Sequence, residues 1–403
     1  MTGRTFISDY AKDNSFILWL PSWYPNKLKL YDGDFIQRHA QAAALYNNIY
    51  VIKLAADEEG IITHDVKTEI NKKGNLTEHI IYYKKPRSLF GRIIAAYKAI
   101  RLYRHAINNL LLQNGRPRFV HVHVAMRGGL LALWMKRKYG IPFILTEHWA
   151  GFSPGAKKNF SSLPFYLQLS WRRIAKKATA VSVVSSYLGT LLKKQFSIRN
   201  YTVIPNVVNT EIFYPVNRIT SPYPQFIHVS GLDYQKNPEA ILNAFAIIKK
   251  WFSDFRLDIF GPVKKNLIQK VNDLQLQQQV NFHNEVPQNK LAEFVAQSDA
   301  LVLYSRYESF GCVIIEANAC GIPVVVSDLP VFHETVKHGI NGLFTRGDDP
   351  ISLATTIKDL MEKKYQFDAI SIAEIASSKY SYQVVGKQIN DWYEMVKESL
   401  DKH

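Results

Sequence analysis

The chain has 403 residues, of which 47% are hydrophobic and 21% charged, and its formal net charge is +16. This composition excludes an intrinsically disordered protein, and the length predicts two domains, because a single core rarely grows beyond about 300 residues. No window approaches the roughly 18 uncharged apolar residues of a membrane-spanning helix. Residues 1–15, MTGRTFISDYAKDNS, are polar and lack the apolar core of a secretory signal, which predicts a cytoplasmic protein.

The chain contains two cysteines, Cys312 and Cys320, eight positions apart in a predicted helix. About 12 Å of helical rise separates them, which is beyond the reach of a disulfide bond. Two reduced cysteines agree with a cytoplasmic location.

The excess positive charge lies in the first half of the chain. Residues 1–200 contain 31 Lys and Arg against 11 Asp and Glu, and residues 201–403 contain 19 against 23, so the net charges are +20 and −4. Basic and aromatic residues follow amphipathic helical patterns at 91–111 and 165–178, which suits contact with an anionic membrane surface. A solvated basic face and a nucleic-acid partner are the alternatives.

Short β-branched runs alternate with helical patterns, such as those at 238–251 and 289–298, along nearly the whole chain. This alternation predicts parallel sheets covered by helices on both faces. Ser and Pro interrupt the alternation at 217–225, near the expected junction of two doubly wound domains, and a long amphipathic helix is predicted at 381–400. Ligands of such domains bind at the carboxyl ends of strands, which predicts a substrate in the cleft between them. The predicted strands are 15–20, 48–54, 119–124, 142–147, 180–185 and 201–206, then 225–231, 256–261, 280–284, 300–305 and 322–328.

Residues 305–325, SRYESFGCVIIEANACGIPVV, carry Glu308 and Glu316 in an otherwise apolar segment. The pattern indicates the end of a strand, a tight turn at Gly311 and a helix. The free N–H groups of the helix start, at residues 310–313, would bind phosphate, because they and the helix dipole favour negative charge. Eight residues of helical rise span about 12 Å, so the two carboxylates would accept hydroxyl groups at both ends of a nucleotide-sugar. The alternative is a helix N-terminal charge and one solvent-facing Glu.

This stretch resembles the signature of retaining glycosyltransferases of family 4, in which Ser-x-x-Glu-x-Phe-Gly precedes Glu-Ala and Gly-x-Pro-Val-Val. The resemblance extends over most of the chain and implies the GT-B fold, an α/β architecture of two Rossmann-like doubly wound domains facing across a cleft. It implies an acceptor-binding domain over 1–212, joined by the helix at 381–400, and a nucleotide-sugar-binding domain over 213–380. The matching residues are Ser305, Glu308, Phe310, Gly311, Glu316, Ala317, Gly321, Pro323, Val324 and Val325.

The resemblance also implies individual roles. Glu308 would lie by the donor sugar hydroxyls, His148 near the reaction centre, and Lys236 beside the leaving diphosphate, so these three are the predicted catalytic residues. Glu316 would hold the ribose. The full set of predicted donor-binding residues is Gly33, Lys236, Asn237, Val286, Arg306, Phe310, Gly311, Cys312, Val313 and Glu316.

One departure from the family concerns the diphosphate site, where an Arg and a Lys usually act together. The segment SGLDYQKN (230–237) supplies Lys236 and Asn237 but has Gly231 where the Arg would stand. Arg306 or a basic residue from the N-terminal half would replace that Arg.

Two patterns resemble metal sites without predicting one. The Asp-x-Asp of YDGDF (31–35) is the metal motif of a different glycosyltransferase fold, but its glycine fits the first loop of this one. His121 and His123 lie on one face of a strand, and no ligand spacing around them completes a zinc site. Packed histidines are the better interpretation, and neither a metal nor a cofactor is expected.

The residues and the resemblance to family 4 together predict a cytoplasmic retaining glycosyltransferase that moves a hexose-type sugar from a nucleoside diphosphate to a glycan or lipid-linked glycan, in polysaccharide or glycoconjugate biosynthesis. The basic first half favours a lipid-linked acceptor and peripheral contact with the inner face of the membrane. Trp19, Trp23 and Tyr24 are candidates for stacking an acceptor sugar or for core packing. Two alternatives stay open: a sugar-nucleotide 2-epimerase on the same fold, and a nucleic-acid-binding protein, although no RNP, KH or helix-turn-helix motif is present.

Overall fold

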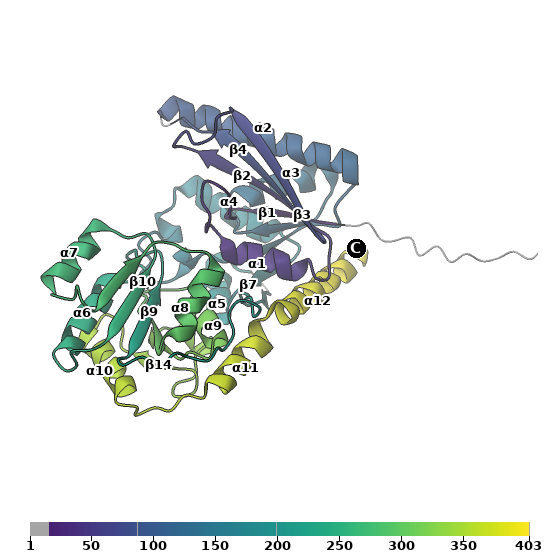
Figure 1. Ribbon diagram of the computed structural model, residues 1–403. Helices are drawn as coiled ribbons and strands as arrows, with labels where there is room; N and C mark the ends of the chain where they lie inside the picture. Colours follow the sequence, from purple (N-terminus) through teal and green to yellow (C-terminus); the bar gives the residue numbers. More distant parts are fainter. Residues whose placement is uncertain (1–15, 87, 199, 403) are drawn as a thin grey trace, which may run out of the picture.

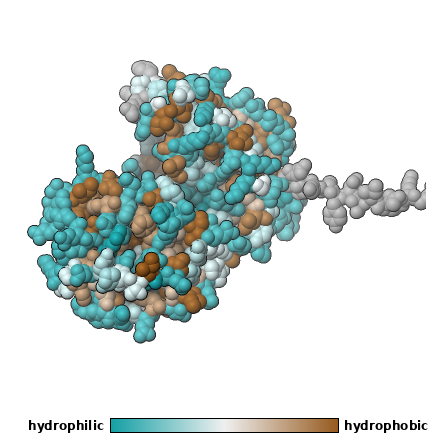
Figure 2. All heavy atoms as spheres, viewed as in Figure 1, coloured by the Kyte–Doolittle hydropathy of each residue, from teal (hydrophilic) through white to brown (hydrophobic). Residues whose placement is uncertain are grey.

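The computed structural model describes residues 16–86, 88–198 and 200–402, so the prediction about a secretory signal at 1–15 lies outside the described residues. Within them the chain forms two α/β halves, each built on its own sheet (Figure 1). Hydrophilic side chains cover most of the face shown in Figure 2, with apolar side chains in scattered patches.

The first half contains an eight-stranded sheet in the order β3-β4-β2-β1-β5-β6-β7-β8. All neighbouring strands run parallel except β3 and β4, which form an antiparallel hairpin at one edge. The central strand β1 is buried along its whole length, as expected for a strand covered on both faces. The strands are β1 (Ile17–Pro21), β2 (Ile49–Asp57), β3 (Val66–Lys73), β4 (Leu76–Lys84), β5 (Val120–His123), β6 (Phe143–Glu147), β7 (Val181–Val183) and β8 (Thr202–Val203).

Helices cover the first sheet, and two single 3₁₀ turns lie in the loop after β6. These turns, Ala150–Phe152 and Phe160–Ser162, hold the chain close to the carboxyl end of β6, where the cleft between the halves begins. The helices are α1 (Asp34–Ala43), α2 (Leu89–Asn114), α3 (Met126–Tyr139), α4 (Phe165–Lys177) and α5 (Ser186–Phe196).

The second half contains a six-stranded, entirely parallel sheet in the order β11-β10-β9-β12-β13-β14. Its strands are β9 (Gln225–Val229), β10 (Arg256–Phe260), β11 (Val280–His283), β12 (Ala300–Leu303), β13 (Val324–Ser327) and β14 (Gly342–Thr345). Its helices are α6 (Pro238–Lys249), α7 (Lys265–Asp273), α8 (Gln288–Gln297), α9 (Cys312–Ala319) and α10 (Pro350–Met361), with a 3₁₀ turn at Pro330–Glu334.

The chain then returns to the first half through α11 (Ala369–Tyr380) and α12 (Tyr382–Asp401). In Figure 1, α12 leaves the second half and lies along α1, and the two helices are in contact. Tyr393 of α12 is fully buried and its hydroxyl lies 2.7 Å from Nδ1 of His121 on β5. An apolar cluster also joins α5 to the second half, where Leu188 packs with Val331 and Phe332. These contacts fix how the two halves face each other.

Every strand predicted from the sequence is present, although 201–206 shortens to the two residues of β8. Three strands were not predicted: β3, β4 and β14. The residues of β3, VKTEINKK, are mostly exposed and polar, so this edge strand lacks the apolar pattern by which buried strands are recognised. The predicted helices are likewise present as α2, α4, α6, α8, α9 and α12.

Candidate active site

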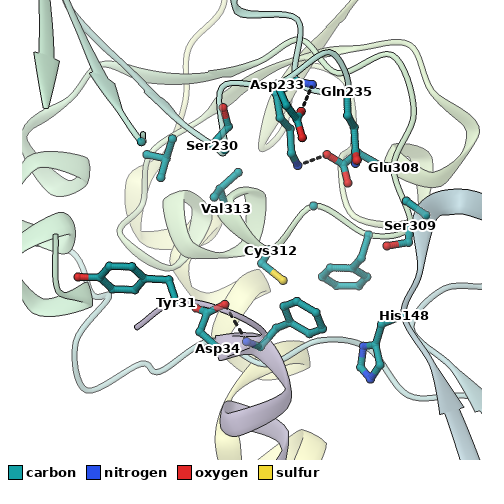
Figure 3. A pocket seen from close by; sticks show the side chains of 18 of the residues that line it. Tyr31, Asp34, His148, Ser230, Asp233, Gln235, Glu308, Ser309, Cys312 and Val313 are labelled. Carbon is teal, nitrogen blue, oxygen red and sulfur yellow. Dashed lines mark hydrogen bonds and ion pairs between the residues drawn. The ribbon is translucent and has the colours of Figure 1, made fainter. Parts of the chain in front are cut away.

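A cavity of about 720 Å³ lies where the two halves face each other. Pockets that bind small molecules typically have volumes of roughly 300–1,000 Å³. Figure 3 shows Tyr31, Asp34 and His148 of the first half on one side, and Asp233 and Glu308 of the second half on the other. The cavity therefore lies at the carboxyl ends of strands from both sheets, where α/β proteins bind ligands.

The start of α9 forms one wall of the cavity. Gly311 is its N-cap residue, with φ of 91°, and within the described residues no side chain caps the helix. A Cβ atom at this position would lie 2.9 Å from the Phe332 ring, so both the left-handed backbone and the packing require glycine. Cys312 and Val313 line the cavity, so the free N–H groups of this first helical turn are available to an anion.

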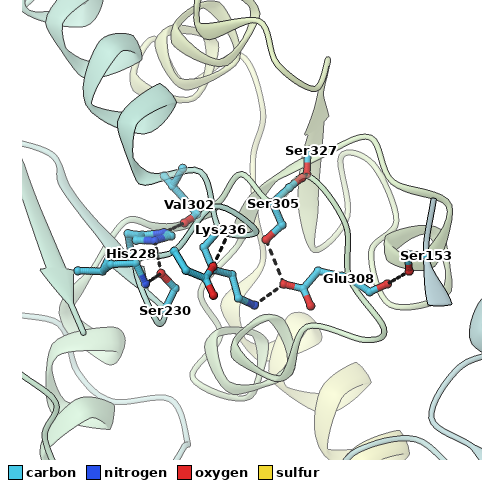
Figure 4. A network of polar contacts seen from close by, with 10 residues as sticks. Ser153, His228, Ser230, Lys236, Val302, Ser305, Glu308 and Ser327 are labelled. Atoms are coloured by element: carbon cyan, nitrogen blue, oxygen red, sulfur yellow. Dashed lines mark hydrogen bonds and ion pairs between the residues drawn. The ribbon is translucent and has the colours of Figure 1, made fainter. Parts of the chain in front are cut away.

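Glu308 lies beside this helix start in a network of polar contacts (Figure 4). Its Oε1 accepts hydrogen bonds from the Ser305 hydroxyl, at 3.0 Å, and from the Lys236 ammonium. Burial opposes the charge on Lys236, but Glu308 together with Asp233 outweighs burial and raises the lysine pKa, so this ammonium stays protonated. The carbonyl oxygen of Glu308 accepts from Ser153 at 3.3 Å, which ties the turn to the first half.

Glu316 lies on the other side of the helix start and is bound to the first half of the chain. Nη1 of Arg38, on α1, donates to Oε1 of Glu316 at 2.6 Å, and Nη2 lies 3.1 Å from Oδ2 of Asp34. Both members of the Arg38–Glu316 pair are buried, and Nε of Arg38 has no partner in the described part of the chain. Burial opposes the charge on Arg38, but Asp34 and Glu316 together raise its pKa.

His148 reaches the cavity from the end of β6, backed by other buried histidines. Its Nε2 lies 3.1 Å from Nδ1 of His123, while its Nδ1 has no partner among the described residues. Burial lowers the pKa of both imidazoles well below the usual value, so both are neutral at physiological pH. The adjacent Glu147 is buried too, which raises its pKa to about 7, and it accepts the backbone N–H of His148 at 2.9 Å.

The structure brings most of the predicted site residues together and leaves three outside the cavity lining. Gly33 begins α1 in a left-handed conformation, and a Cβ there would lie 2.6 Å from Cβ of Trp23. Asn237 begins α6, and its side chain donates to Asp348 at 3.1 Å. Those lining the cavity are His148, Lys236, Val286, Glu308, Phe310, Gly311, Cys312, Val313 and Glu316.

Arg306, the third, does not reach the cavity where a replacement for the family arginine is needed. Its guanidinium lies 4.4 Å from the centre of the Tyr234 ring, donates to the Tyr234 carbonyl at 2.7 Å, and is 3.3 Å from Asp348. Arg38, Lys157 and Lys158 line the cavity from the first half instead. The sequence signal for them was only the general expectation of a basic residue from that half, because nothing near Gly231 along the chain points to them.

The aromatic and histidine candidates from the sequence lie mostly in the core of the first half. Trp19 and Tyr24 are fully buried core residues, whereas Trp23 lines the cavity. His121 is packed between Tyr393 and Thr146, whose hydroxyls lie 2.7 and 2.6 Å from its ring nitrogens. Over the described ranges no group of three or more His, Cys, Asp or Glu residues is arranged to hold a metal ion. Both cysteines are free thiols.

The fold is that of GT-B glycosyltransferases. Sucrose-phosphate synthase from Thermosynechococcus elongatus matches with a TM-score of 0.75 at 18% identity, over 95% of this chain and 100% of that one. HepE from Anabaena, in complex with UDP, matches with a TM-score of 0.68 at 19% identity, over 94% of this chain and 100% of that one.

Two family models together span most of the chain: Glycosyltransferase Family 4 matches residues 59–212, and glycosyl transferases group 1 matches residues 210–374. The chain belongs to this glycosyltransferase family and is a transferase. An uncharacterised glycosyltransferase of Methanocaldococcus jannaschii is 27% identical over 78% of this chain and 83% of that protein. The O-antigen chain mannosyltransferase RfbU of Salmonella typhimurium is 29% identical over 56% of this chain and 63% of that protein. Nothing in these comparisons supports an epimerase or a nucleic-acid-binding protein.

Proposed function

We propose that this protein transfers a hexose-type sugar from a nucleoside diphosphate to a glycan or lipid-linked glycan, with retention of anomeric configuration. The observation that carries the proposal is the uncapped start of α9 in the cavity, with Glu308 and Lys236 on one side and Glu316 on the other. A nucleotide-sugar offers a diphosphate to the helix start and hydroxyl groups to the two carboxylates. The UDP complex of HepE and the mannosyltransferase activity in the name of RfbU support this class of donor.

The two halves divide the substrates in this proposal. Residues 213–380 hold the donor, and residues 1–212 together with the helix at 381–400 bind the acceptor. The cavity is lined by both parts, so the sugar to be transferred lies between them. No metal or cofactor is required, because Lys236 and the helix start supply positive charge where the leaving diphosphate gains negative charge.

The Lys236–Glu308 ion pair is the part that donor binding would rearrange. In the described structure Lys236 neutralises Glu308, whereas a bound diphosphate would compete for the same ammonium. Glu308 would then accept a sugar hydroxyl, and His148, a neutral imidazole, would contact the sugar from the opposite side. In a retaining reaction the acceptor attacks from the face that the phosphate leaves. The departing phosphate oxygen then takes the acceptor proton, and no side chain need act as nucleophile.

A thermal-shift panel of UDP-, GDP- and ADP-sugars tests the donor proposal directly. One nucleotide should stabilise the protein, and Glu316→Gln should weaken its binding, because the ribose loses a charged acceptor. Glu308→Gln should depress turnover more than nucleotide affinity. Unchanged nucleotide affinity in the Glu316→Gln variant, or no stabilisation by any nucleotide-sugar, would contradict the assignment.

The surface of the first half suits peripheral contact with a membrane at the inner face. None of the described helices combines the length and hydropathy of a membrane-spanning segment. However, α2 exposes Ile93, Ile94 and Tyr97, and α4 exposes Phe165 and Tyr166. Basic residues on the same two helices would contact anionic headgroups while these apolar side chains enter the interface.

Co-sedimentation with vesicles at low salt measures this contact. We expect preference for anionic over neutral lipid, and a loss of binding when Ile93 and Ile94 are both replaced by Ser. Ile351→Ser, at an exposed position on α10 in the second half, is the matched control. Equal binding to anionic and neutral vesicles would remove the membrane from the proposal.

A further inference from the structure

A second cavity, of about 400 Å³, lies in the first half of the chain. It is lined by the segments that follow β1 and β5 and by the last residues of β2, so it opens at the carboxyl ends of these strands. In the sheet, β2 and β5 lie on opposite sides of β1. The strand order therefore grows from β1 toward β2 first, and then from β1 in the opposite direction toward β5. The crevice at such a reversal of strand order is where α/β domains bind ligands.

Lys53 lies in this cavity on β2 and is only 6% exposed. Its ammonium donates to the carbonyl oxygen of Ser22, which is the one hydrogen bond that it makes within the described residues. An ammonium carries three donors, so two stay available to a ligand. Burial lowers the pKa of Lys53 to about 8, opposed by Asp32 and reinforced by Arg127 and Lys29. A buried, under-coordinated lysine is costly unless an anion completes its surroundings.

Two of the acidic residues that line this cavity, Asp57 and Glu58, bind other groups of the protein. Both carboxylate oxygens of Asp57 accept backbone N–H groups of residues 59–62, at 2.8 to 3.1 Å. Glu58 forms an ion pair with Lys85 at 2.6 Å. The lining holds four cations (Lys29, Lys53, Lys85 and Arg127) and four carboxylates (Asp32, Asp57, Glu58 and Glu59), so its formal charge is zero. Neither Lys53 nor Arg127 forms an ion pair with a described residue, so both cations are available to a ligand.

The start of α3 adds free backbone N–H groups to these two cations. Met126 and Arg127, its first two residues, line the cavity, and no side chain caps the helix in the described part of the chain. Arg127 is exposed and forms no ion pair or hydrogen bond with a described residue. The cavity thus offers an ammonium, a guanidinium and a helix N-terminus to one ligand, and phosphate oxygens match all three.

Trp23 connects the second cavity to the active site, because its side chain lines both. Its ring is 6.3 Å from that of Phe35, and the Phe35 ring is 5.1 Å from the imidazole of His148. An aromatic wall therefore runs from the second cavity to the place proposed for the donor sugar. A sugar lying across Trp23 would reach both cavities.

We propose that the second cavity binds the phosphate or diphosphate group of a phosphorylated acceptor, so that the acceptor sugar lies along Trp23 and its hydroxyl enters the active site. This inference rests on the proposed function and names the substrate class for the acceptor. Lys53 and Arg127 would be binding residues for the acceptor, without contact to the donor.

A titration with methyl phosphate at constant ionic strength tests the site while the nucleotide selected in the donor panel saturates the active site. The wild-type protein should bind the probe, and Lys53→Met and Arg127→Gln should each lower the affinity at least fivefold. Lys72→Met, at an exposed lysine on β3, is the matched control and should bind as the wild type does. All three variants should retain the donor affinity. A failure of the donor proposal would already show in the nucleotide panel.

A second arm separates a soluble phosphate from a lipid phosphate. Phosphatidylcholine vesicles with and without phosphatidic acid replace methyl phosphate, and the same variants are compared. Loss of binding in Lys53→Met and Arg127→Gln with either probe supports the site and identifies its source of phosphate. Wild-type binding by both variants in both arms, or no binding of either probe by the wild type, would overturn the proposal. Arg127 is exposed, so the Arg127→Gln variant should fold. It therefore tests the phosphate site even if Lys53→Met does not fold.

Discussion

The active-site cavity and the second cavity are built by the chain in different ways. The wall proposed to bind the donor in the first cavity is one continuous strand, turn and helix, from β12 through Gly311 to α9. The second cavity collects Ser22, Lys53 and Arg127 from segments that are tens of residues apart. A site within one segment leaves a readable motif, whereas a site assembled from several segments leaves no local pattern in the sequence.

The largest effect should follow from breaking the contiguous site. Lys236→Met removes the cation beside the helix start, and we expect turnover to fall by about 10²- to 10³-fold, because losing one preorganised charge-stabilising group typically costs that much. Steady-state kinetics with the donor selected in the nucleotide panel would measure it. Lys270→Met, on α7 of the same half, is the control for a general loss of charge. A decrease below fivefold would contradict the role of Lys236.

A smaller effect should follow from breaking the contact between the halves. Arg38→Met leaves Glu316 buried without its cation and should reduce the free energy of unfolding by about 3 kcal/mol. The double variant Arg38→Met/Glu316→Leu should lose less than the sum of the single variants, because the pair is then absent rather than broken. Urea denaturation measures all three. Additive losses would show that the 2.6 Å ion pair contributes no coupling.

The buried histidines of the first half predict a pH dependence. Burial lowers the pKa of His39 to about 3, so the folded protein keeps it neutral while the unfolded chain protonates near pH 6.5. The stability from this residue is therefore complete above pH 6.5 and is lost as the pH falls, by about 2 kcal/mol at pH 5. His39→Gln should reduce the difference in unfolding free energy between pH 7.5 and pH 5 by about that amount.

The control for this measurement is His105→Gln, at an exposed position on α2. Both variants should be compared with the wild type by denaturant titration at the two pH values. An identical pH dependence of His39→Gln and the wild type would contradict the neutral, buried state of His39.

The smallest effect is expected at Arg306. Its guanidinium contacts Tyr234 and Asp348 outside the cavity lining, so Arg306→Gln should change donor affinity less than about threefold, which corresponds to about 0.6 kcal/mol. Nucleotide titration monitored by thermal shift would detect a larger change. A tenfold loss would show that Arg306 moves into the cavity when the donor binds.

Much of the fold could be predicted from local patterns. The buried parallel strands were recognisable because both faces of each sheet are covered, which makes their residues continuously apolar. The hairpin of β3 and β4 was missed for the opposite reason: Lys67, Asn71 and Lys72 of β3 are exposed at a sheet edge. Pairing with β4, not an apolar pattern, holds this strand in place.

The candidate site likewise has a part that the sequence predicted and a part that it did not. Glu308, Gly311 and Glu316 were predictable because a helix start that opens into a cavity through this tight turn needs glycine, and because the two carboxylates lie within one helix and its preceding turn. The sequence by itself determined this side of the cavity, since the geometry there depends on a few consecutive backbone angles. Only the tertiary structure decided that Arg38 pairs with Glu316, that Arg306 lies outside the cavity, and that Lys53 and Arg127 share a second one. Such contacts depend on how whole sheets and helices pack, and no local spacing records that packing.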